Sequence, residues 1–249
     1  FTIQAPTLKG EIKKARASNY TWQRVISEFI DNSNDVLIKS IQDLKIIQIK
    51  LNLDTNDNLC SICISDNFTE GIKDHSIWSW TYERDREEED CGEFGTGFKS
   101  GSVNIASELL VLTRYDNGYT RMRAEWDEMA IRNDYTPSSD SINESDYKIY
   151  HPFDFGSTFV LKHLIKENLP SDIDYIRVEL LSHISVVYKK LLKTNKDINI
   201  YVDDILINHK TVLNEMGSKK IHKREKIPKS EIHVYKNKDK YIPVVMNGM

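Results

Sequence analysis

The sequence contains little cysteine, only three residues in 249. Small secreted domains held by disulfides are much richer in cysteine, so the composition argues against a disulfide scaffold and favours reduced thiols in a cytosolic or nuclear protein. Cys60 and Cys63 have a zinc-like spacing, but a closed zinc site needs four ligands, and positions i and i+3 of a strand face opposite sides. The seven histidines form neither an HExxH pattern nor a close pair at metal-binding spacing.

Long apolar runs are also missing. No stretch approaches the roughly eighteen consecutive apolar residues of a membrane-spanning helix, and no basic patch followed by an apolar segment marks a secretory signal. We therefore expect no membrane partner. The net charge of −4 provides no overall attraction to nucleic acid, and the lysine-rich stretch 219–229 is interpreted as a solvated loop. Because the sequence starts at Phe1 and stops after an apolar run at 244–246, we expect a piece of a longer chain.

Hydrophobic periodicity predicts alternating helices and hairpins. Helical spacing of apolar residues predicts helices at about 20–44, 98–109 and 171–193. Alternation and turn residues predict hairpins at 47–53 with 59–65, 110–114 with 119–126, and 199–202 with 205–207, and a further strand from 159. The polar stretches 1–18 and 132–147 are predicted to be an arm and a mobile loop.

The order of these segments predicts an α+β fold. Successive hairpins separated by helices indicate a two-layer sandwich, in which a mixed, mainly antiparallel sheet has helices on one face. The βαβ alternation of a Rossmann fold is not seen. The hairpin at 199–207 is interpreted as the opening of a second unit, so we expect a first domain at 1–168 and a partial second domain at 169–249.

The strongest local signal is a glycine-rich loop, Gly92-Glu93-Phe94-Gly95-Thr96-Gly97-Phe98-Lys99-Ser100-Gly101. Closely spaced glycines expose backbone N–H groups, and the helix that follows offers its positive end, which together suit a phosphate chain. The alternative is a flexible loop without a ligand. A Walker A loop would need Lys directly after the second glycine, but Phe98 intervenes, and a Rossmann fingerprint would need a glycine where Ser100 stands.

Three motifs in a fixed order resemble the GHKL ATPase superfamily, which includes gyrase, heat-shock chaperones, histidine kinases and MutL. The run 28–35, Glu-Phe-Ile-Asp-Asn-Ser-Asn-Asp, is similar to the first motif, a helix with Glu and then Asn four residues later. The loop at 92–102 resembles the third motif, and Gly156-Ser157-Thr158 leading into a strand resembles the fourth. Together they cover roughly residues 20–165, and the resemblance implies the Bergerat ATP-binding fold.

The second motif of the family, Asp-x-Gly-x-Gly after a strand, is present only in altered form. Asp66 follows a predicted strand, but the segment that ends at Gly71 has one glycine fewer and one residue more than the family pattern. A carboxylate at a strand end can accept a hydrogen bond from the amino group of adenine, and this is the role that we expect for Asp66. A turn or helix-capping aspartate is the alternative.

The resemblance implies a role for each matching position. Glu28 would be the catalytic base that activates the attacking water, and Asn32 would bind Mg²⁺ through its side-chain oxygen. Lys99 would reach a phosphate as a point charge. The residues expected to contact ATP are Asn32, Asp35, Asp66, Gly71, Gly92, Phe94, Gly95, Thr96, Gly97, Phe98, Lys99, Ser157 and Thr158. For Glu28 and Asn32 the alternative is an ordinary polar helix face, and between Ser157 and Thr158 the sequence does not choose.

The string Phe-Lys-Ser-Gly-Ser at 98–102 resembles MORC-type ATPases most. This likeness implies slow, Mg²⁺-dependent ATP hydrolysis, homodimerisation in the ATP-bound state, a lid at about 75–91, and DNA or chromatin as a further partner. The segment after 169 would then begin a transducer-like (S5-like) α/β domain. A different class is the alternative: a nucleotide-gated binding or assembly module with little or no turnover.

Overall fold

We analysed a computed structural model, which describes residues 7–18, 20–73, 75–78, 97–195 and 197–207, and the backbone of four strands beyond them. The described helices are α1 (Leu8–Arg16), α2 (Trp22–Lys39), α3 (Gly97–Ile105), α4 (Trp126–Arg132), α5 (Glu144–Lys148), α6 (Ile173–Val187) and α7 (Lys189–Thr194), with the 3-10 helices η1 (His75–Trp78) and η2 (Lys166–Asn168). Among these residues, no helix combines the length and apolar character needed to cross a bilayer.

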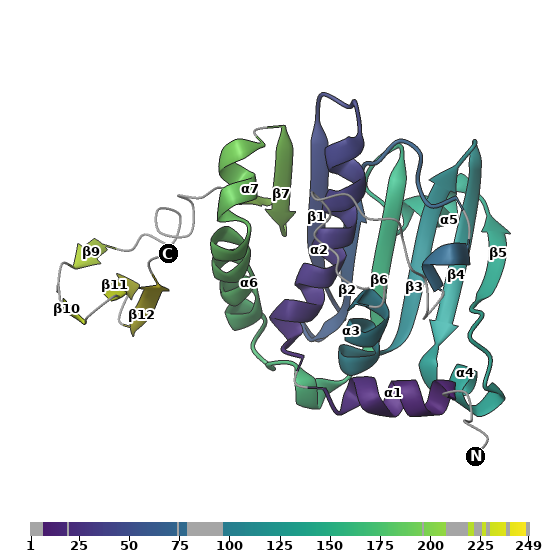
Figure 1. Cartoon of the computed structure of the whole chain (residues 1–249), viewed down its shortest axis with the longest axis horizontal. Helices are drawn as coiled ribbons and strands as arrows, with labels where there is room; N and C mark the ends of the chain where they lie inside the picture. Colours follow the sequence, from purple (N-terminus) through teal and green to yellow (C-terminus); the bar gives the residue numbers. More distant parts are fainter. Residues whose placement is uncertain are drawn as a thin grey trace, which may run out of the picture.

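One eight-stranded sheet organises the molecule. Its strands are β1 (Lys45–Leu53), β2 (Leu59–Asp66), β3 (Ala106–Tyr115), β4 (Gly118–Glu125), β5 (Ser138–Ile142), β6 (Gly156–Leu164), β7 (Ile198–Val202) and β8 (Ile205–Ile207). They are ordered β5-β4-β3-β6-β2-β1-β7-β8, and every neighbouring pair is antiparallel except β1 with β7. The prediction of a mixed, mainly antiparallel α+β fold is therefore confirmed (Figure 1).

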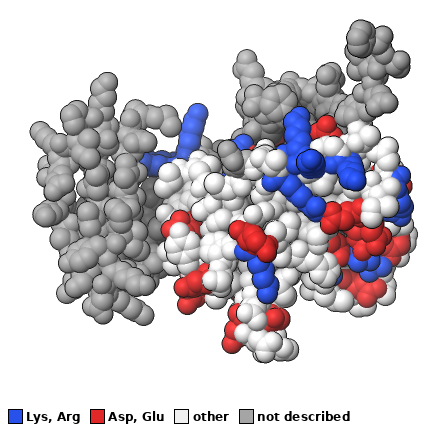
Figure 2. Space-filling model, turned by 90° about the horizontal axis from the view of Figure 1, so that it is seen from below, with Lys and Arg blue, Asp and Glu red and all other residues white. Residues whose placement is uncertain are grey.

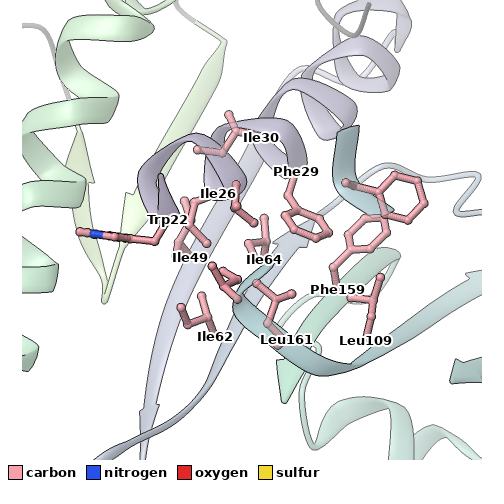
Figure 3. Packing of buried hydrophobic residues seen from close by; sticks show 14 of the residues in the cluster. Trp22, Ile26, Phe29, Ile30, Ile49, Ile62, Ile64, Leu109, Phe159 and Leu161 are labelled. Carbon is pink, nitrogen blue, oxygen red and sulfur yellow. The ribbon is translucent and has the colours of Figure 1, made fainter. Parts of the chain in front are cut away.

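The main core lies between the sheet and the helices. Ile26 and Phe29 of α2 lie toward the central strands, where Ile49, Ile62, Ile64, Phe159 and Leu161 come from β1, β2 and β6 (Figure 3). Ile30 of the same helix is also fully buried. Alternation along each strand sends one set of side chains into this core and the other set to the opposite face. The first set contains Ile62, Ile64 and Asp66, so the last residue of β2 faces the helices.

Two predictions about polar segments were wrong. The expected N-terminal arm contains α1, which Thr7 caps by accepting from the N–H of Gly10 and which buries Leu8 and Ile12. The expected mobile loop at 132–147 contains strand β5 and most of α5. Tyr147 anchors α5, because its fully buried ring packs with a second apolar cluster on the opposite face of the sheet. The helices are therefore not confined to one face.

Helix ends also differ from the predicted ones. The helix predicted to reach residue 44 ends at Lys39, and α3 ends at Ile105, where β3 begins at once. The long helix predicted at 171–193 is broken at Tyr188, whose backbone lies at φ −93° and ψ 16° between α6 and α7. Apolar spacing continues through such boundaries, so periodicity alone does not reveal them.

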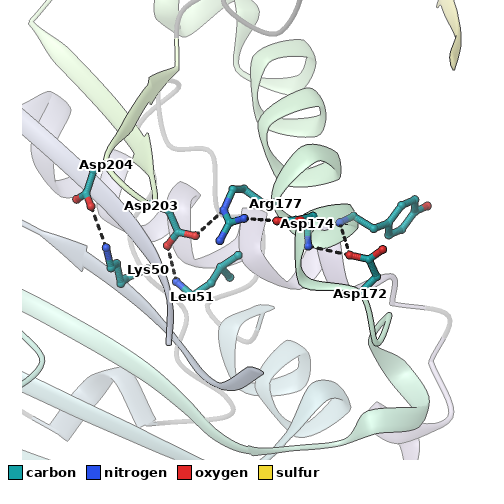
Figure 4. A network of polar contacts seen from close by, with 8 residues as sticks. Lys50, Leu51, Asp172, Asp174, Arg177, Asp203 and Asp204 are labelled. Atoms are coloured by element: carbon teal, nitrogen blue, oxygen red, sulfur yellow. Dashed lines mark hydrogen bonds and ion pairs between the residues drawn. The ribbon is translucent and has the colours of Figure 1, made fainter. Parts of the chain in front are cut away.

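The hairpin at 198–207 belongs to the large sheet. Strand β7 pairs in parallel with β1, and the turn after β7 is fastened to its surroundings: Asp203 accepts from the N–H of Leu51 at 2.9 Å and from Arg177 Nε of α6 at 2.9 Å (Figure 4). Strands β7 and β8 therefore extend the sheet of the first predicted domain, although they lie after residue 168, the predicted domain boundary. Four further strands, β9 (Lys219–Ile221), β10 (Lys226–Ile227), β11 (Ser230–Asn237) and β12 (Lys240–Asn247), form a separate sheet.

Candidate functional site

Glu28 of α2 lies against Gly97, the first residue of α3. A Cβ on Gly97 would stand only 1.8 Å from Glu28 Oε2, so glycine is the residue that lets this carboxylate approach the backbone. The other oxygen, Oε1, accepts from Arg24 Nε at 2.8 Å and forms an ion pair with Arg24 at 2.8 Å. The carboxylate is therefore held between Arg24 of its own helix and Gly97, the first residue of α3.

The rest of the first motif follows along α2. Asn32 is half-buried and lies one turn after Glu28, on the same side of the helix. Asp35 is buried, with 2% of its surface exposed. Ser33, which the sequence analysis did not select, donates from Oγ to Asp66 Oδ2 at 3.1 Å. Helix α2 thus carries Glu28, the acid of the first motif. About one and a half turns later, through Ser33, it contacts Asp66, the acid of the second motif.

Asp66 is a buried carboxylate at the end of β2, with 4% of its surface exposed. Besides Ser33, the N–H of Phe68 donates to its Oδ1 at 3.1 Å. Burial raises the pKa of Asp66 to about 6, although these hydrogen bonds act in the opposite direction. The side chain accepts hydrogen bonds from two sides, as a carboxylate that recognises a donor group would.

The structure separates Ser157 from Thr158. Ser157 is paired with Asp66 across β6 and β2 and lies on the helix side of the sheet, where its hydroxyl is 2.9 Å from Thr113 Oγ1. Thr158 points to the opposite face and is 2.7 Å from Ser65 Oγ and 2.8 Å from His151 Nδ1. Neighbouring strand residues face opposite sides, so only one of the two can share a ligand with Asp66.

Gly71 has a left-handed backbone, with φ at +61°. A Cβ there would stand 2.1 Å from the backbone oxygen of Arg114, so the turn after β2 packs directly on β3. The N–H of Ile72 donates to Thr113 Oγ1 at 2.7 Å. Thr113 therefore links this turn to Ser157. Thr113 was not predicted from the sequence, and its only signal is a hydroxyl directly after the apolar run at 109–112.

Phe98 and Lys99, the two residues after Gly97, are buried, although the motif predicted that both would contact ATP. Phe98 packs in an aromatic group with Phe29, Phe159 and Trp78. Lys99 is fully buried, and its Nζ donates to the backbone oxygen of Ile77 in η1 at 2.8 Å. Burial lowers the pKa of Lys99 to about 7. Gly92, Phe94, Gly95 and Thr96 lie outside the described residues.

The described part of the expected lid is η1. The indole of Trp78 is 3% exposed and donates to Met122 Sδ at 3.1 Å, so this ring fills the core. Residues 79–91 are outside the described part of the chain. A hollow of about 320 Å³ opens on the opposite face of the sheet, beside Lys50, Ser65 and Tyr150, and none of the candidate residues lines it.

The arrangement thus brings two groups of predicted residues together on the helix side of the sheet. Glu28 meets Gly97, while Asp66 meets Ser157 and lies near the turn that contains Gly71. A comparison with protein families finds that the model for "Histidine kinase-, DNA gyrase B-, and HSP90-like ATPase" matches residues 20–154, more than half of the chain. A search of curated proteins found no match.

Proposed function

The chain belongs to the histidine kinase-, DNA gyrase B- and HSP90-like ATPases, and on this basis we propose that it binds ATP with Mg²⁺ and hydrolyses it slowly. The observation that carries the proposal is the course of α2. This one helix holds Glu28 against Gly97 of the glycine-rich loop and, through Ser33, contacts the buried carboxylate of Asp66. One helix therefore carries the candidate base and contacts both the proposed phosphate-binding end and the proposed adenine-binding acid.

The adenine end of the proposed site is Asp66. Its carboxylate would accept from the amino group of the base, with Ser157, Thr113 and the turn at Gly71 shaping the surroundings. Thr158 is left out of the proposed site because it hydrogen-bonds on the opposite face of the sheet. The cost of burying Asp66 is consistent with a functional group, since an apolar residue would suit this position better if packing alone mattered.

The phosphate end is the N-terminus of α3 with the loop that precedes it. The N–H groups there would bind phosphate oxygens, and Glu28 would orient and deprotonate the attacking water. Asn32, one turn from Glu28, offers the oxygen ligand that Mg²⁺ prefers, and the ion would neutralise phosphate charge there. Asp35 lies a further turn along α2. For Lys99 to bind a phosphate, its Nζ must leave the backbone oxygen of Ile77.

A melting experiment with variants tests the proposal. ATP with Mg²⁺ should raise the melting temperature, because a ligand at about 100 times its dissociation constant adds about 2.7 kcal/mol to the folded state. Glu28→Ala should keep this shift but lower turnover about 100-fold or more, whereas Asn32→Ala should weaken the Mg²⁺-dependent shift. Absence of any shift at millimolar nucleotide overturns ATP binding, and hydrolysis by Glu28→Ala at the parent rate removes Glu28 as the base.

One observation favours a second candidate function, a nucleotide-gated binding module with little turnover. Arg24 occupies Oε1 of Glu28, the group that hydrolysis would need. A steady-state phosphate-release assay distinguishes the two functions. Binding without phosphate release would favour the module.

We further propose a MORC-like role, in which the ATP-bound chain dimerises and a transducer-like domain lies within 169–249. Its start is now proposed at the separate strands of 219–247, because β7 and β8 belong to the large sheet. DNA or chromatin is a proposed partner on the strength of the resemblance alone. The face of the molecule seen in Figure 2 carries basic and acidic side chains in separate small groups. The net charge of −4 likewise adds no general attraction to DNA.

A further inference from the structure

The C-terminal end of α6 contacts the turn of α2 that carries Glu28. Tyr188 Oη donates to Asp31 Oδ1 at 2.6 Å and lies 3.0 Å from the backbone oxygen of Ser27. His183 Nε2 lies 2.9 Å from Ser27 Oγ. Residues 27 and 31 lie one helical turn apart on the same face, so α6 contacts both ends of a single turn of α2. Figure 1 shows the two helices side by side.

The contact of Tyr188 with the backbone oxygen of Ser27 is buried, and the contacts of Asp31 and His183 are partly buried, so water competes only weakly for them. Ser27 is 1% exposed and Tyr188 is 5% exposed. A hydroxyl that donates to a carboxylate at 2.6 Å is among the stronger neutral-to-charged hydrogen bonds in proteins. His183 is neutral near pH 7, because burial lowers its pKa and the charge of Arg24 acts in the same direction. Hydrogen bonds therefore fix the turn from the α6 side.

Glu28 lies on another side of the same turn. Its Oε2 stands against the Cα of Gly97, with no room for even a methyl group between them. A small rotation or shift of residues 27–31 would therefore move the carboxylate relative to the glycine-rich loop. Misplacement of about 1 Å can cost as much as about 100-fold in rate, even when the altered residue does not touch the substrate.

We propose that Tyr188, acting through Asp31 and Ser27, positions the Glu28 carboxylate for catalysis. The inference rests on the proposed role of Glu28 as the base. Tyr188 is also the residue at which α6 ends and α7 begins, and α7 leads directly to β7 in the sheet. The ring of Tyr188 packs in the hydrophobic core, which fixes the position of its hydroxyl relative to α2.

The test uses Tyr188→Phe, which keeps the ring in the core and removes only the hydroxyl. Tyr175→Phe is the matched control, because Tyr175 lies on the same helix and is 50% exposed. We expect Tyr188→Phe to lower kcat about tenfold, while the Kd for a non-hydrolysable ATP analogue changes by less than about threefold. Amide hydrogen exchange at residues 27–31 should become faster in Tyr188→Phe and stay unchanged in the control.

A double-mutant cycle with Asp31→Asn identifies the route. If Tyr188 acts through Asp31, the effects of the two substitutions on kcat will be less than additive. The inference is overturned if kcat is unchanged in Tyr188→Phe, or if Tyr175→Phe lowers kcat by the same factor. It is also overturned if the wild type binds the analogue but does not hydrolyse ATP. If the wild type shows no nucleotide-dependent stabilisation, the proposed function fails, and the exchange measurement alone then decides whether Tyr188 holds this turn.

Discussion

Lys99 shows how strongly this fold constrains a single ionisable residue. Its side chain is fully buried, with Nζ 2.8 Å from the backbone oxygen of Ile77 and 4.9 Å from the centre of the Phe98 ring. Burial lowers its pKa from 10.5 to about 7. A lysine in such surroundings weakens the folded state at neutral pH, because the unfolded chain holds the proton more tightly.

We therefore expect the free energy of unfolding to depend on pH through Lys99. Between about pH 7 and pH 10 the unfolded chain binds more protons at this position, so the contribution of Lys99 to stability rises with pH, by at most about 1.4 kcal/mol per unit. Lys99→Met keeps the stem and removes the charge. Urea unfolding at pH 7 and pH 9 should show a gain over wild type that is larger at pH 7, whereas an equal gain at both would contradict the buried charge.

At the scale of elements, the turn between β7 and β8 fastens the edge of the sheet. Asp203 and Asp204 both have positive φ, at 45° and 68°, but their side chains differ in surroundings. The carboxylate of Asp203 is 12% exposed and binds Leu51 and Arg177, while that of Asp204 is 70% exposed and pairs with Lys50 (Figure 4). Because the Asp203 carboxylate is more buried, we expect its contacts to stabilise the fold more than those of Asp204.

Glycine substitutions separate these two contributions, because glycine accepts positive φ at either position. Asp203→Gly should lower the free energy of unfolding by about 2–3 kcal/mol, since it removes the acceptor of the Leu51 N–H and of Arg177 Nε, while Arg177 keeps its contact with Asp174. Asp204→Gly should cost less than about 1 kcal/mol, as expected for an exposed ion pair. Chemical denaturation of both variants gives the comparison, and equal losses would show that backbone effects of glycine dominate.

At the scale of the whole molecule, we expect ATP to drive homodimerisation. The resemblance to MORC-type ATPases implies that the nucleotide would order a lid whose surface meets a second copy, so that binding would offset the entropy of fixing the segment. Trp78, at the start of the expected lid, fills the core of its own chain and supplies no such surface. A dimer contact from this region must therefore come from other residues.

Sedimentation of Glu28→Ala tests the dimer, because a variant that retains ATP keeps the proposed state populated. With ATP and Mg²⁺ the mass should approach twice the 29.0 kDa of one chain, and without nucleotide it should remain that of the monomer. Wild type with ADP is the control. A monomer under every condition, at tens of micromolar protein, would count against the switch in this chain.

The sequence by itself determined most of the secondary structure around the site. Alternation in 47–53 and 59–65 predicted β1 and β2, and helical spacing in 20–44 predicted α2 although not its end at Lys39, because burial of one face imposes a period on the residues that provide it. The turn residues at 116–118 fixed the hairpin of β3 and β4, since Asp116 and Asn117 tolerate the positive φ that it needs. Local chemistry was enough in these places.

Only the tertiary structure decided how distant residues meet. No local pattern shows that Tyr147 buries its ring against the far face of the sheet, that β7 pairs with β1, or that Tyr188 holds the turn that carries Glu28. It also placed Ser157 beside Asp66 and sent Thr158 to the other face, a choice that depends on strand register. Strand register and contacts between helices arise from packing between segments far apart in the chain, and local patterns in a single sequence do not record which distant segments will pack together.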